Sequence, residues 1–442
     1  MDYYVSLLGD DSNVGTSKAY PWRSIERVNT AQLLPGDSVR FHAHQTFVGN
    51  LCLIGEGTPL EDKPLTFGSY GSGRATIDAR DGTGFLVKNM GSVHLVGLNF
   101  VGAGASKNAG SGILFVNTLL EGVKLADIRI HCIDVSGFKD SGICFKAEPK
   151  DRSWSGFRDV RITHTTSHDN GDTGISCIGV WNPKRDGYSH ADFYIGKCSA
   201  YRNVGIPGKE SHSGNGIVLA QVEGALIEHC RAYENGGLND YEGGGPVGIW
   251  AWDADRVIIQ FNESHHNRTG SSKDGGGFDL DGGVRNSIVQ CNYSHDNDGP
   301  GYLLAQFSGA RAFYGNVLHH NVSVNDGRKN RYGSIHLWST GASGGLADTI
   351  FRENTIFTTQ SADGDAAAID CRSEGIRNIR LYNNCFQTDG RTVIVRGENN
   401  PNVLFEGNTF DTDCRSPKFS RDLRDFTEAA RKSDPETPPP LP

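Results

Sequence analysis

The stretches Tyr233-Glu234-Asn235 and His265-His266-Asn267 show the phrase that decides the fold: an aromatic residue or histidine, one variable residue and then asparagine. Six copies of the phrase define the repeat, and the other four are His168-Asp169-Asn170, Tyr201-Arg202-Asn203, His295-Asp296-Asn297 and His319-His320-Asn321. The six asparagines are 33, 32, 32, 30 and 24 residues apart, a period typical of stacked repeats. Each repeat carries short β-branched runs and no helical period. The sequence therefore predicts an all-β parallel β-helix, with the asparagines forming a hydrogen-bonded ladder inside one turn.

A solenoid grows in one dimension, so the 442 residues can form a single β-helical domain. We expect an N-terminal cap over residues 1–36, the β-helix over 37–415, and a C-terminal helix and proline-rich tail over 416–442. Ser24 is expected to cap a short helix running to about Leu33, which would close the first coil. A second helix is expected from Ser420 to Arg431.

Charge and hydropathy limit the possible partners. The net charge of −9 argues against a nucleic acid or an acidic membrane as partner, although a local basic site could still accept an anionic sugar. No stretch approaches 18 apolar residues, and the N-terminus lacks a signal-peptide pattern, although the sequence could begin after a removed signal. We expect no nucleic-acid or membrane partner. We also expect a monomer that is secreted or periplasmic.

Three of the ten cysteines, Cys198, Cys230 and Cys291, are expected at the same place in successive repeats. Such cysteines predict a buried stack of thiols, with disulfides as the alternative. No CxxC pair with the spacing of a zinc site is present.

The outward face of one strand per coil carries the candidate site. These strands follow a glycine or another small residue, and side chains alternate along a strand, so the second and fourth residues after that small residue point outward. In stacking order, the outward pairs of the central coils are Trp250/Trp252, Asp279/Asp281, Leu303/Ala305, His336/Trp338, Asp370/Arg372 and Ile394/Arg396. Tryptophans beside carboxylates suit a saccharide, and the apolar Leu303/Ala305 coil leaves room for a sugar ring.

Asp279 and Asp281 are the strongest candidates for catalysis. Two carboxyl groups that point outward from the same face of one strand repel each other. This raises the pKa of one and leaves the other ionised, which gives the acid and the base that glycoside hydrolysis requires. The alternative is that these aspartates bind a structural calcium ion or cap turns.

The remaining candidates would support the pair. We expect Trp250, Trp252 and Trp338 to be sugar platforms, with packing under the 236–247 loop as the alternative. His336 would assist protonation or hydroxyl recognition, unless it is an ordinary surface histidine. Asp370 and Arg372 would contact substrate, with a ladder pairing of Arg372 and Arg396 with Asp370 and Glu398 as the alternative. Glu242, on a loop, is a further acid/base or substrate-binding candidate, and His265, His295 and His319 are expected to be structural.

The opening of the chain resembles that of pectin-lyase-like right-handed β-helix enzymes, in Tyr3-Tyr4-Val5-Ser6, Gly9-Asp10-Asp11-Ser12-Asn13, Pro21-Trp22 and Pro35-Gly36-Asp37. The phrase Asp274-Gly275-Gly276-Gly277-Phe278, followed by Asn286 and Asp296-Asn297-Asp298-Gly299, is similar to the calcium and catalytic coils of family-nine pectate lyases. The resemblance covers residues 3–412 and implies a right-handed β-helix.

The chain departs from those lyases at one position. They place a catalytic lysine four residues after the glycine, where this chain has Asp281, and the nearest outward lysine is Lys146, several coils away. A carboxylate pair looks more like the β-helix glycoside hydrolases of the fucosidase/xylanase type.

We therefore expect a glycoside hydrolase that cleaves a plant or algal poly- or oligosaccharide and requires no cofactor. The first alternative is a polysaccharide lyase acting by β-elimination on a uronate. Its calcium ion would be held by Asp279, Asp281, Asp296 and Asp298. The second alternative is a non-catalytic glycan-binding β-helix.

Overall fold

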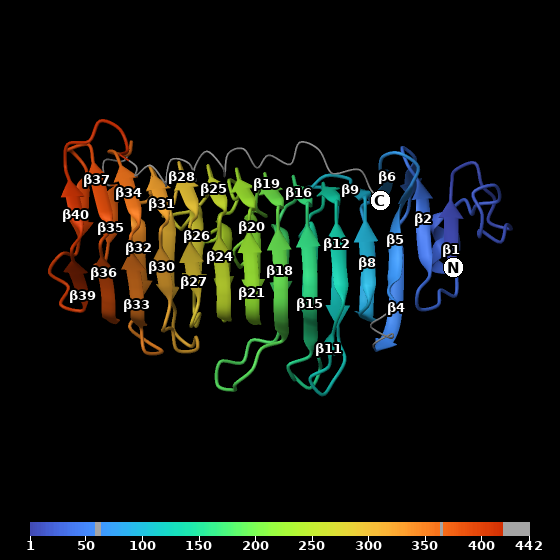
Figure 1. The fold of residues 1–442 in the computed structure, drawn as a ribbon, viewed down its shortest axis with the longest axis horizontal. Helices are drawn as coiled ribbons and strands as arrows, with labels where there is room; N and C mark the ends of the chain where they lie inside the picture. The colour runs from blue at the N-terminus through green and yellow to red at the C-terminus, as the bar shows by residue number, and fades with distance from the viewer. Residues whose placement is uncertain (58–62, 363–365, 419–442) are drawn as a thin grey trace. The chain divides into compact units, whose positions relative to one another are not determined.

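The structure is a computed structural model that describes residues 1–57, 63–362 and 366–418. The expected helix from Ser420 to Arg431 lies outside these residues. The chain divides into two compact units, which are described separately. Unit 1 contains residues 1–180 and 187–199, and unit 2 contains residues 181–186 and the described residues from 200 onward. Each unit is a parallel β-solenoid built from three sheets, and its strands can be followed in Figure 1.

In unit 1, the first sheet is β1 (Asp2–Val5), β2 (Ser38–His42), β5 (Leu65–Tyr70), β8 (Val93–Val96), β12 (Ile128–His131), β15 (Gly156–Thr163) and β18 (His190–Gly196), with β11 (Lys124–Leu125) beside β15. The second sheet is β4 (Leu51–Gly57), β7 (Phe85–Met90), β10 (Ile113–Asn117), β14 (Ile143–Ala147) and β17 (Thr173–Ile178). The third sheet is β3 (Thr46–Val48), β6 (Ala75–Arg80), β9 (Leu98–Gly102), β13 (Asp134–Ser136) and β16 (Thr166–His168). Strand β19 (Ser199–Tyr201) lies at the chain boundary between the units.

In unit 2, the first sheet is β21 (Val222–Glu228), β24 (Asp255–Gln260), β27 (Ile288–Gln290), β30 (Val317–His319), β33 (Leu346–Arg352), β36 (Ile376–Tyr382) and β39 (Val403–Glu406). The second, called the site sheet below, is β20 (Asn215–Ala220), β23 (Val247–Trp252), β26 (Gly276–Asp281), β29 (Tyr302–Gln306), β32 (Gly333–Ser339), β35 (Ala367–Asp370) and β38 (Val393–Arg396). The third is β22 (Arg231–Tyr233), β25 (Glu263–His265), β28 (Tyr293–His295), β31 (Val322–Val324), β34 (Thr355–Thr358), β37 (Cys385–Thr388) and β40 (Thr409–Asp411).

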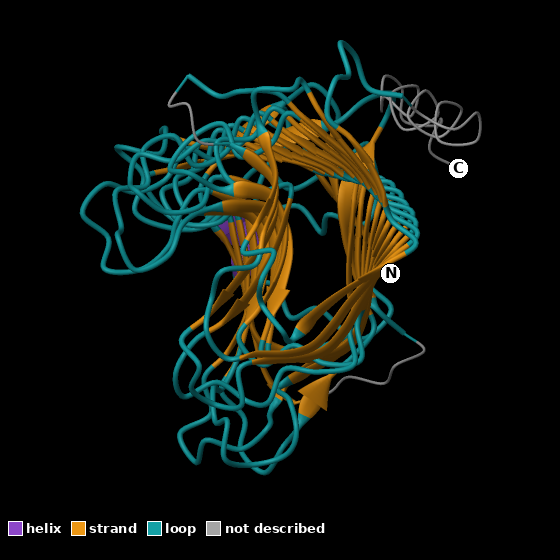
Figure 2. Ribbon diagram, turned by 90° about the vertical axis from the view of Figure 1, so that its left-hand side faces the viewer, coloured by secondary structure: helices purple, strands orange, loops and turns teal. Residues whose placement is uncertain are grey.

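The core of each unit lies between its three sheets, which are drawn as orange arrows in Figure 2. On β26 the inward side chains Phe278 and Leu280 are buried, as the alternation of a strand predicts. A glycine near the start of several site-sheet strands has a packing role. A Cβ atom at Gly248 would overlap the Ser264 hydroxyl of the neighbouring corner. This small residue fixes the register from which the outward pairs follow.

The asparagine ladder is confirmed for the four copies in unit 2 that end third-sheet strands. Nδ2 of Asn203 donates to Oδ1 of Asn235 at 3.0 Å, and the same bond links Asn235 to Asn267 and Asn267 to Asn297 at 2.9 Å. The variable residue before each asparagine is left-handed, with φ of 54° at His266. That conformation turns the chain and buries the asparagine. In unit 1, Oδ1 of Asn170 accepts the backbone N–H of Phe138 at 3.1 Å.

The prediction that Asn321 continues this ladder is wrong. His319 ends β30 of the first sheet, whereas the third-sheet strand of that coil ends at Val324. The next ladder position is Asp326, whose Oδ1 accepts Asn297 Nδ2 at 2.7 Å. A second ladder runs along the other corner through Asn262, Asn292, Asn321, Asn354, Asn384 and Asn408. The short 24-residue interval before Asn321 marked this change of corner.

The expected cysteine stack is also corrected in part. Arg231 pairs with Glu263 and Glu263 with Tyr293, so the Cys230 position is occupied by Asn262 and Asn292 in the next coils. Cys291 lies one residue earlier and does not share that position. All ten cysteines are thiols, so the disulfide alternative is not realised.

The N-terminal helix α1 (Ile25–Asn29) is shorter than expected. The Ser24 side chain accepts the N–H of Arg27 and caps the helix as predicted, but the helix ends at Asn29 instead of near Leu33. Its buried side chains are Ile25 and Val28. In the described part of the chain, no helix has both the length and the hydropathy to cross a bilayer.

Candidate active site

The outward residues of the site sheet stack as the sequence predicts. Trp250 is paired with Asp279 and Trp252 with Asp281 between β23 and β26. One row continues from Asp279 through Leu303 and His336 to Asp370. The order of aromatic, acidic and apolar coils is therefore confirmed.

The last coil departs from the expected alignment. Asp370 is paired with Arg396, so the expected alignment of Asp370 with Ile394 is wrong by two residues. Strand β35 ends at Asp370, and Arg372 follows it outside the strand. The glycine frame that fixes the earlier coils is absent from these two strands, which follow alanine and threonine.

A cavity of about 690 Å³ lies on this outward face, entirely within unit 2. Its floor comes from the site sheet and its walls from loops around residues 211–212, 241–244, 272–274 and 330–332. The predicted site residues that line it are Trp250, Trp252, Asp281, His336, Trp338, Arg372 and Glu242. Asp279 and Asp370 stand behind it, with 3% and 2% of their surfaces exposed.

Three carboxyl groups meet at the cavity: Asp279 and Asp281 from β26, and Asp274 from the loop before it. Oδ1 of Asp279 has no hydrogen-bond partner among the described residues. Asp281 Oδ1 accepts the N–H of Gly282 at 2.7 Å. Asp274 lines the cavity beside Asp281. Sequence reasoning cited Asp274 only within a resemblance and missed it as a site residue.

Burial raises the pKa of all three carboxyl groups. Burial, opposed by the Gly282 N–H and reinforced by Asp274, raises the pKa of Asp281 to about 7. Burial and the charges of Asp281 and Asp274 raise the pKa of Asp279 well above its ordinary value. Burial also raises the pKa of Asp274, but hydrogen bonds from Gly245 and Tyr332 oppose this. The site can therefore hold both protonated and ionised carboxyl groups near neutral pH.

Tyr332 orients Asp274 and was missed by the sequence reasoning. Its hydroxyl donates to Asp274 Oδ1 at 2.8 Å and accepts the Asp274 backbone N–H at 2.9 Å. Its ring stands edge-on to His336, with centroids 4.9 Å apart. Tyr332 and Asp274 are 58 positions apart in loops of different coils, and no periodic signal predicts their contact.

The three predicted tryptophans differ in what they offer a ligand. Trp250 is 3% exposed and packs with Val218 and Val247, while its Nε1 donates to Asn215 Oδ1 at 3.1 Å. Trp252 is half-buried, and Trp338 is 38% exposed. Trp250 is therefore mainly a packing residue, as the alternative expected, whereas Trp252 and Trp338 present ring surface to the cavity.

A fourth tryptophan, Trp181, stands next to the cavity residues and was not predicted. Its ring centroid lies 6.5 Å from that of Trp252 and 6.1 Å from that of Phe307. Arg311 holds the loop that follows Trp181 by donating to the carbonyls of Asn182 and Arg185 at 3.1 and 2.6 Å. Arg311 is itself fixed by a buried ion pair with Asp253 at 2.6 Å. Trp181 lies outside the strands, after the end of β17 at Ile178, so strand alternation does not predict its contacts.

His336 and Asp370 form the end of the site nearest β38. Burial lowers the pKa of His336 to about 4, so its imidazole is neutral near pH 7. Asp370 Oδ2 lies 3.8 Å from His336 Nδ1, 2.6 Å from Arg372 Nη2 and 3.2 Å from Arg396 Nη1. Arg372 pairs with Asp370 as in the ladder alternative, and Arg396 pairs with Asp370 as well.

Glu242 lies exposed at the rim of the cavity and accepts hydrogen bonds from the backbone and the hydroxyl of Ser272. These bonds lower its pKa, which keeps it ionised. The four aspartates of the calcium alternative do not converge among the described residues. Asp298 pairs with Arg268 at 3.0 Å and Asp296 with His295 at 2.8 Å.

The fold is the right-handed parallel β-solenoid of the pectin-lyase-like type, as the resemblance implied. No protein-family model matches the sequence. The lacto-N-biosidase of Bifidobacterium longum subsp. longum is 22% identical over 94% of this chain and 31% of that protein. The chain thus spans about a third of the length of this curated relative.

Solved structures show the same fold. The GH136 lacto-N-biosidase from Eubacterium ramulus superposes with a TM-score of 0.67 and 18% identity, covering 93% of this chain and 67% of that one. The A-module of the mannuronan C-5 epimerase AlgE4 from Azotobacter vinelandii gives a TM-score of 0.50 at 12% identity, covering 86% and 87% of the two chains.

Proposed function

We propose that the chain is a glycoside hydrolase and that the cavity on the site sheet is its active site. The observation that carries the proposal is that Asp274 and Asp281 line one cavity while their surroundings differ. Burial raises the pKa of both groups, to about 7 for Asp281, and Asp274 accepts two hydrogen bonds that favour its ionised form. This is the acid and carboxylate pair that glycosidic cleavage needs.

In the proposed reaction, the carboxylic acid of Asp281 gives its proton to the glycosidic oxygen as the bond to the anomeric carbon breaks. The Asp274 carboxylate, held by Tyr332 and the Gly245 N–H, stabilises the positive charge that develops at that carbon. It then acts as the base for a water molecule or as the nucleophile. Asp279, the other member of the predicted pair, stands behind the cavity, where burial and the neighbouring carboxylates raise its pKa and favour its protonated form.

We propose an oligosaccharide as the substrate, with sugar rings stacked on Trp252 and Trp338. The name of the Bifidobacterium relative denotes a glycosidase that acts on a lacto-N-biose unit. This supports an oligosaccharide that carries such a disaccharide and gives no support to the plant or algal glycan expected from the sequence. Secretion, the monomeric state and the absence of a required cofactor stay predictions.

The test is a panel of oligosaccharides that includes a chromogenic lacto-N-bioside, assayed with wild type, Asp281→Asn and Asp274→Asn. We expect new reducing ends with wild type and a loss of about a thousandfold or more in each variant. Asp298→Asn is the matched control, because that aspartate pairs with Arg268 outside the cavity, and it should keep its activity. Full activity in Asp281→Asn would overturn the proposal. Binding without turnover on any glycan would favour the non-catalytic alternative.

One observation keeps the lyase as a second candidate. Lys273, in the loop before β26, lines the cavity, although the sequence placed the nearest outward lysine at Lys146. A lysine is the base that elimination from a uronate would use. The lyase predicts products with the ultraviolet absorbance of an unsaturated uronate and a loss of that activity in Lys273→Met. Hydrolysis predicts no such absorbance.

A further inference from the structure

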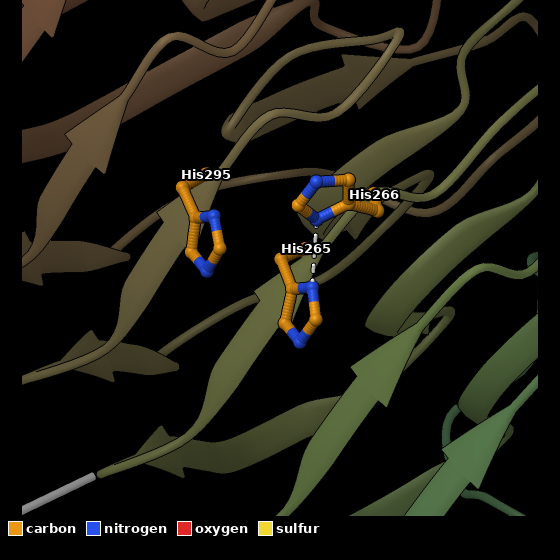
Figure 3. A group of neighbouring side chains, drawn as sticks. All are labelled: His265, His266 and His295. Carbon is orange, nitrogen blue, oxygen red and sulfur yellow. Dashed lines mark hydrogen bonds between the residues drawn. The ribbon is translucent and has the colours of Figure 1, made fainter. Parts of the chain in front are cut away.

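Three histidines gather on the outer side of the third sheet of unit 2, in a different sheet from the cavity. His265 and His295 end the neighbouring strands β25 and β28 and are paired in register. Their rings are stacked with centroids 4.6 Å apart, and the ring of His266 stands perpendicular to both, as Figure 3 shows. One ligand atom from each lies within 4.8 Å of the other two.

The backbone explains why residues adjacent in sequence can face one another. His266 takes the left-handed conformation of the corner, with φ of 54°, and this turns its ring back over the end of β25. Its Nδ1 then lies 2.9 Å from Nδ1 of His265, the contact drawn as a dashed line in Figure 3. All three residues are only partly buried, so an ion can reach them from solvent.

Two carboxylates, Glu263 and Asp296, contact the imidazole of His295. Nε2 of His295 lies 3.4 Å from Oε1 of the buried Glu263, which Arg231 holds through a bond of 3.0 Å to its other oxygen. A carboxylate behind a ligating histidine fixes the ring and increases its basicity. Asp296 Oδ2 is hydrogen-bonded to Nδ1 of the same ring at 2.8 Å, so binding of an ion through Nδ1 has to displace this bond.

We propose that His265, His266 and His295 bind one divalent transition-metal ion that joins two neighbouring coils. Imidazole nitrogens select zinc, nickel and copper over calcium or magnesium. Metal–nitrogen bonds of about 2.0–2.1 Å place ligand nitrogens about 3.4 Å from one another. The Nδ1 atoms of His265 and His266, 2.9 Å apart, need to separate slightly, and the three ligand atoms already lie within 4.8 Å of one another. The ion would cross-link β25 and β28 and stabilise the folded chain by mass action. This site is independent of the proposed hydrolase activity.

The chain supplies a matched control for the test. His319 and His320 repeat the same geometry, with Nδ1 atoms 2.8 Å apart and a left-handed second residue. The residues paired with His319 on the adjacent strands are Gln290 and Arg352, so no third imidazole completes the pair. His320→Ala therefore removes a comparable surface histidine without touching the proposed site.

The experiment is calorimetric titration of zinc chloride into protein that has been stripped with EDTA and carries no histidine tag. We expect one zinc ion per chain and a rise in the thermal unfolding midpoint for wild type and His320→Ala. Affinity should fall on the order of tenfold or more in His266→Ala. His295→Gln is the second ligand variant, and the circular dichroism of each variant without metal shows whether it folds.

A cobalt titration gives a spectroscopic check, because a site with nitrogen ligands produces visible absorption bands that should weaken in both ligand variants. The proposal is overturned if wild type takes up no zinc, if both ligand variants bind it as wild type does, or if His320→Ala loses affinity equally. The last result would mean that zinc binds exposed histidines without selection.

Discussion

Asp281 can act as an acid only while it keeps its proton, and its pKa is about 7 because burial and the Asp274 carboxylate disfavour the ionised form. The proposed mechanism therefore predicts that kcat/KM falls as the pH rises through about 7. A pH profile of wild type checks this, and a profile that stays flat well above neutrality would remove Asp281 from the role of acid.

Tyr332 holds Asp274 through its hydroxyl, and this bond lowers the pKa of that carboxyl group. In Tyr332→Phe the ionised form loses a donor, so the pKa of Asp274 rises and the acidic limb of the profile should move up by about one pH unit. Tyr241→Phe, in the same cavity, is the control and should leave the limb in place. An unmoved limb in Tyr332→Phe would show that Asp274 is not the group that must be ionised.

At the scale of elements, the Asn203–Asn297 ladder ends on a carboxyl group. Burial raises the pKa of Asp326 to about 6, and the hydrogen bonds from Ser323 and Asn297 oppose the shift only in part. Because the folded chain holds this proton more tightly than the unfolded chain does, Asp326 lowers the free energy of unfolding as the pH rises from about 4 to above 6.

Asp326→Asn should therefore stabilise the protein above pH 6 by roughly 1–3 kcal/mol, because asparagine keeps the acceptor for Asn297 without the charge. Urea unfolding at acidic and alkaline pH checks this, since the advantage of the variant should grow with pH. A variant that is less stable than wild type on the alkaline side would contradict it.

Arg311 holds the loop that follows Trp181, and this places the Trp181 ring beside Trp252. We expect Trp181→Ala to raise KM about fivefold with little change in kcat, since one aromatic contact contributes about 1 kcal/mol. Trp181→Phe should restore most of the binding. Because Trp181 is 40% exposed, the unfolding midpoint should hardly change in either variant. An unaltered KM would place Trp181 outside the substrate-binding surface.

At the scale of the whole molecule, the repeat period and strand alternation predicted the β-helix and the outward row of the site sheet. Strand alternation and the small residue near the start of each strand predicted the row from Trp250 to Asp370, because a one-residue slip would turn each side chain to the opposite face. Both corners use asparagine ladders, so the local phrase at Asn321 could not reveal which corner it occupies. Tyr332 and Lys273 line the cavity from loops, and Trp181 contacts Trp252 and Phe307 from another loop. The paths of these loops depend on contacts between coils and leave no periodic pattern in the sequence.

The measurement that tests the central claim most directly is cleavage of a lacto-N-biose-bearing oligosaccharide in water enriched in heavy oxygen, followed by mass spectrometry. The account predicts one heavy oxygen in each new reducing end with wild type and no product with Asp281→Asn. Products that lack the label and absorb in the ultraviolet would contradict it and identify an eliminating enzyme.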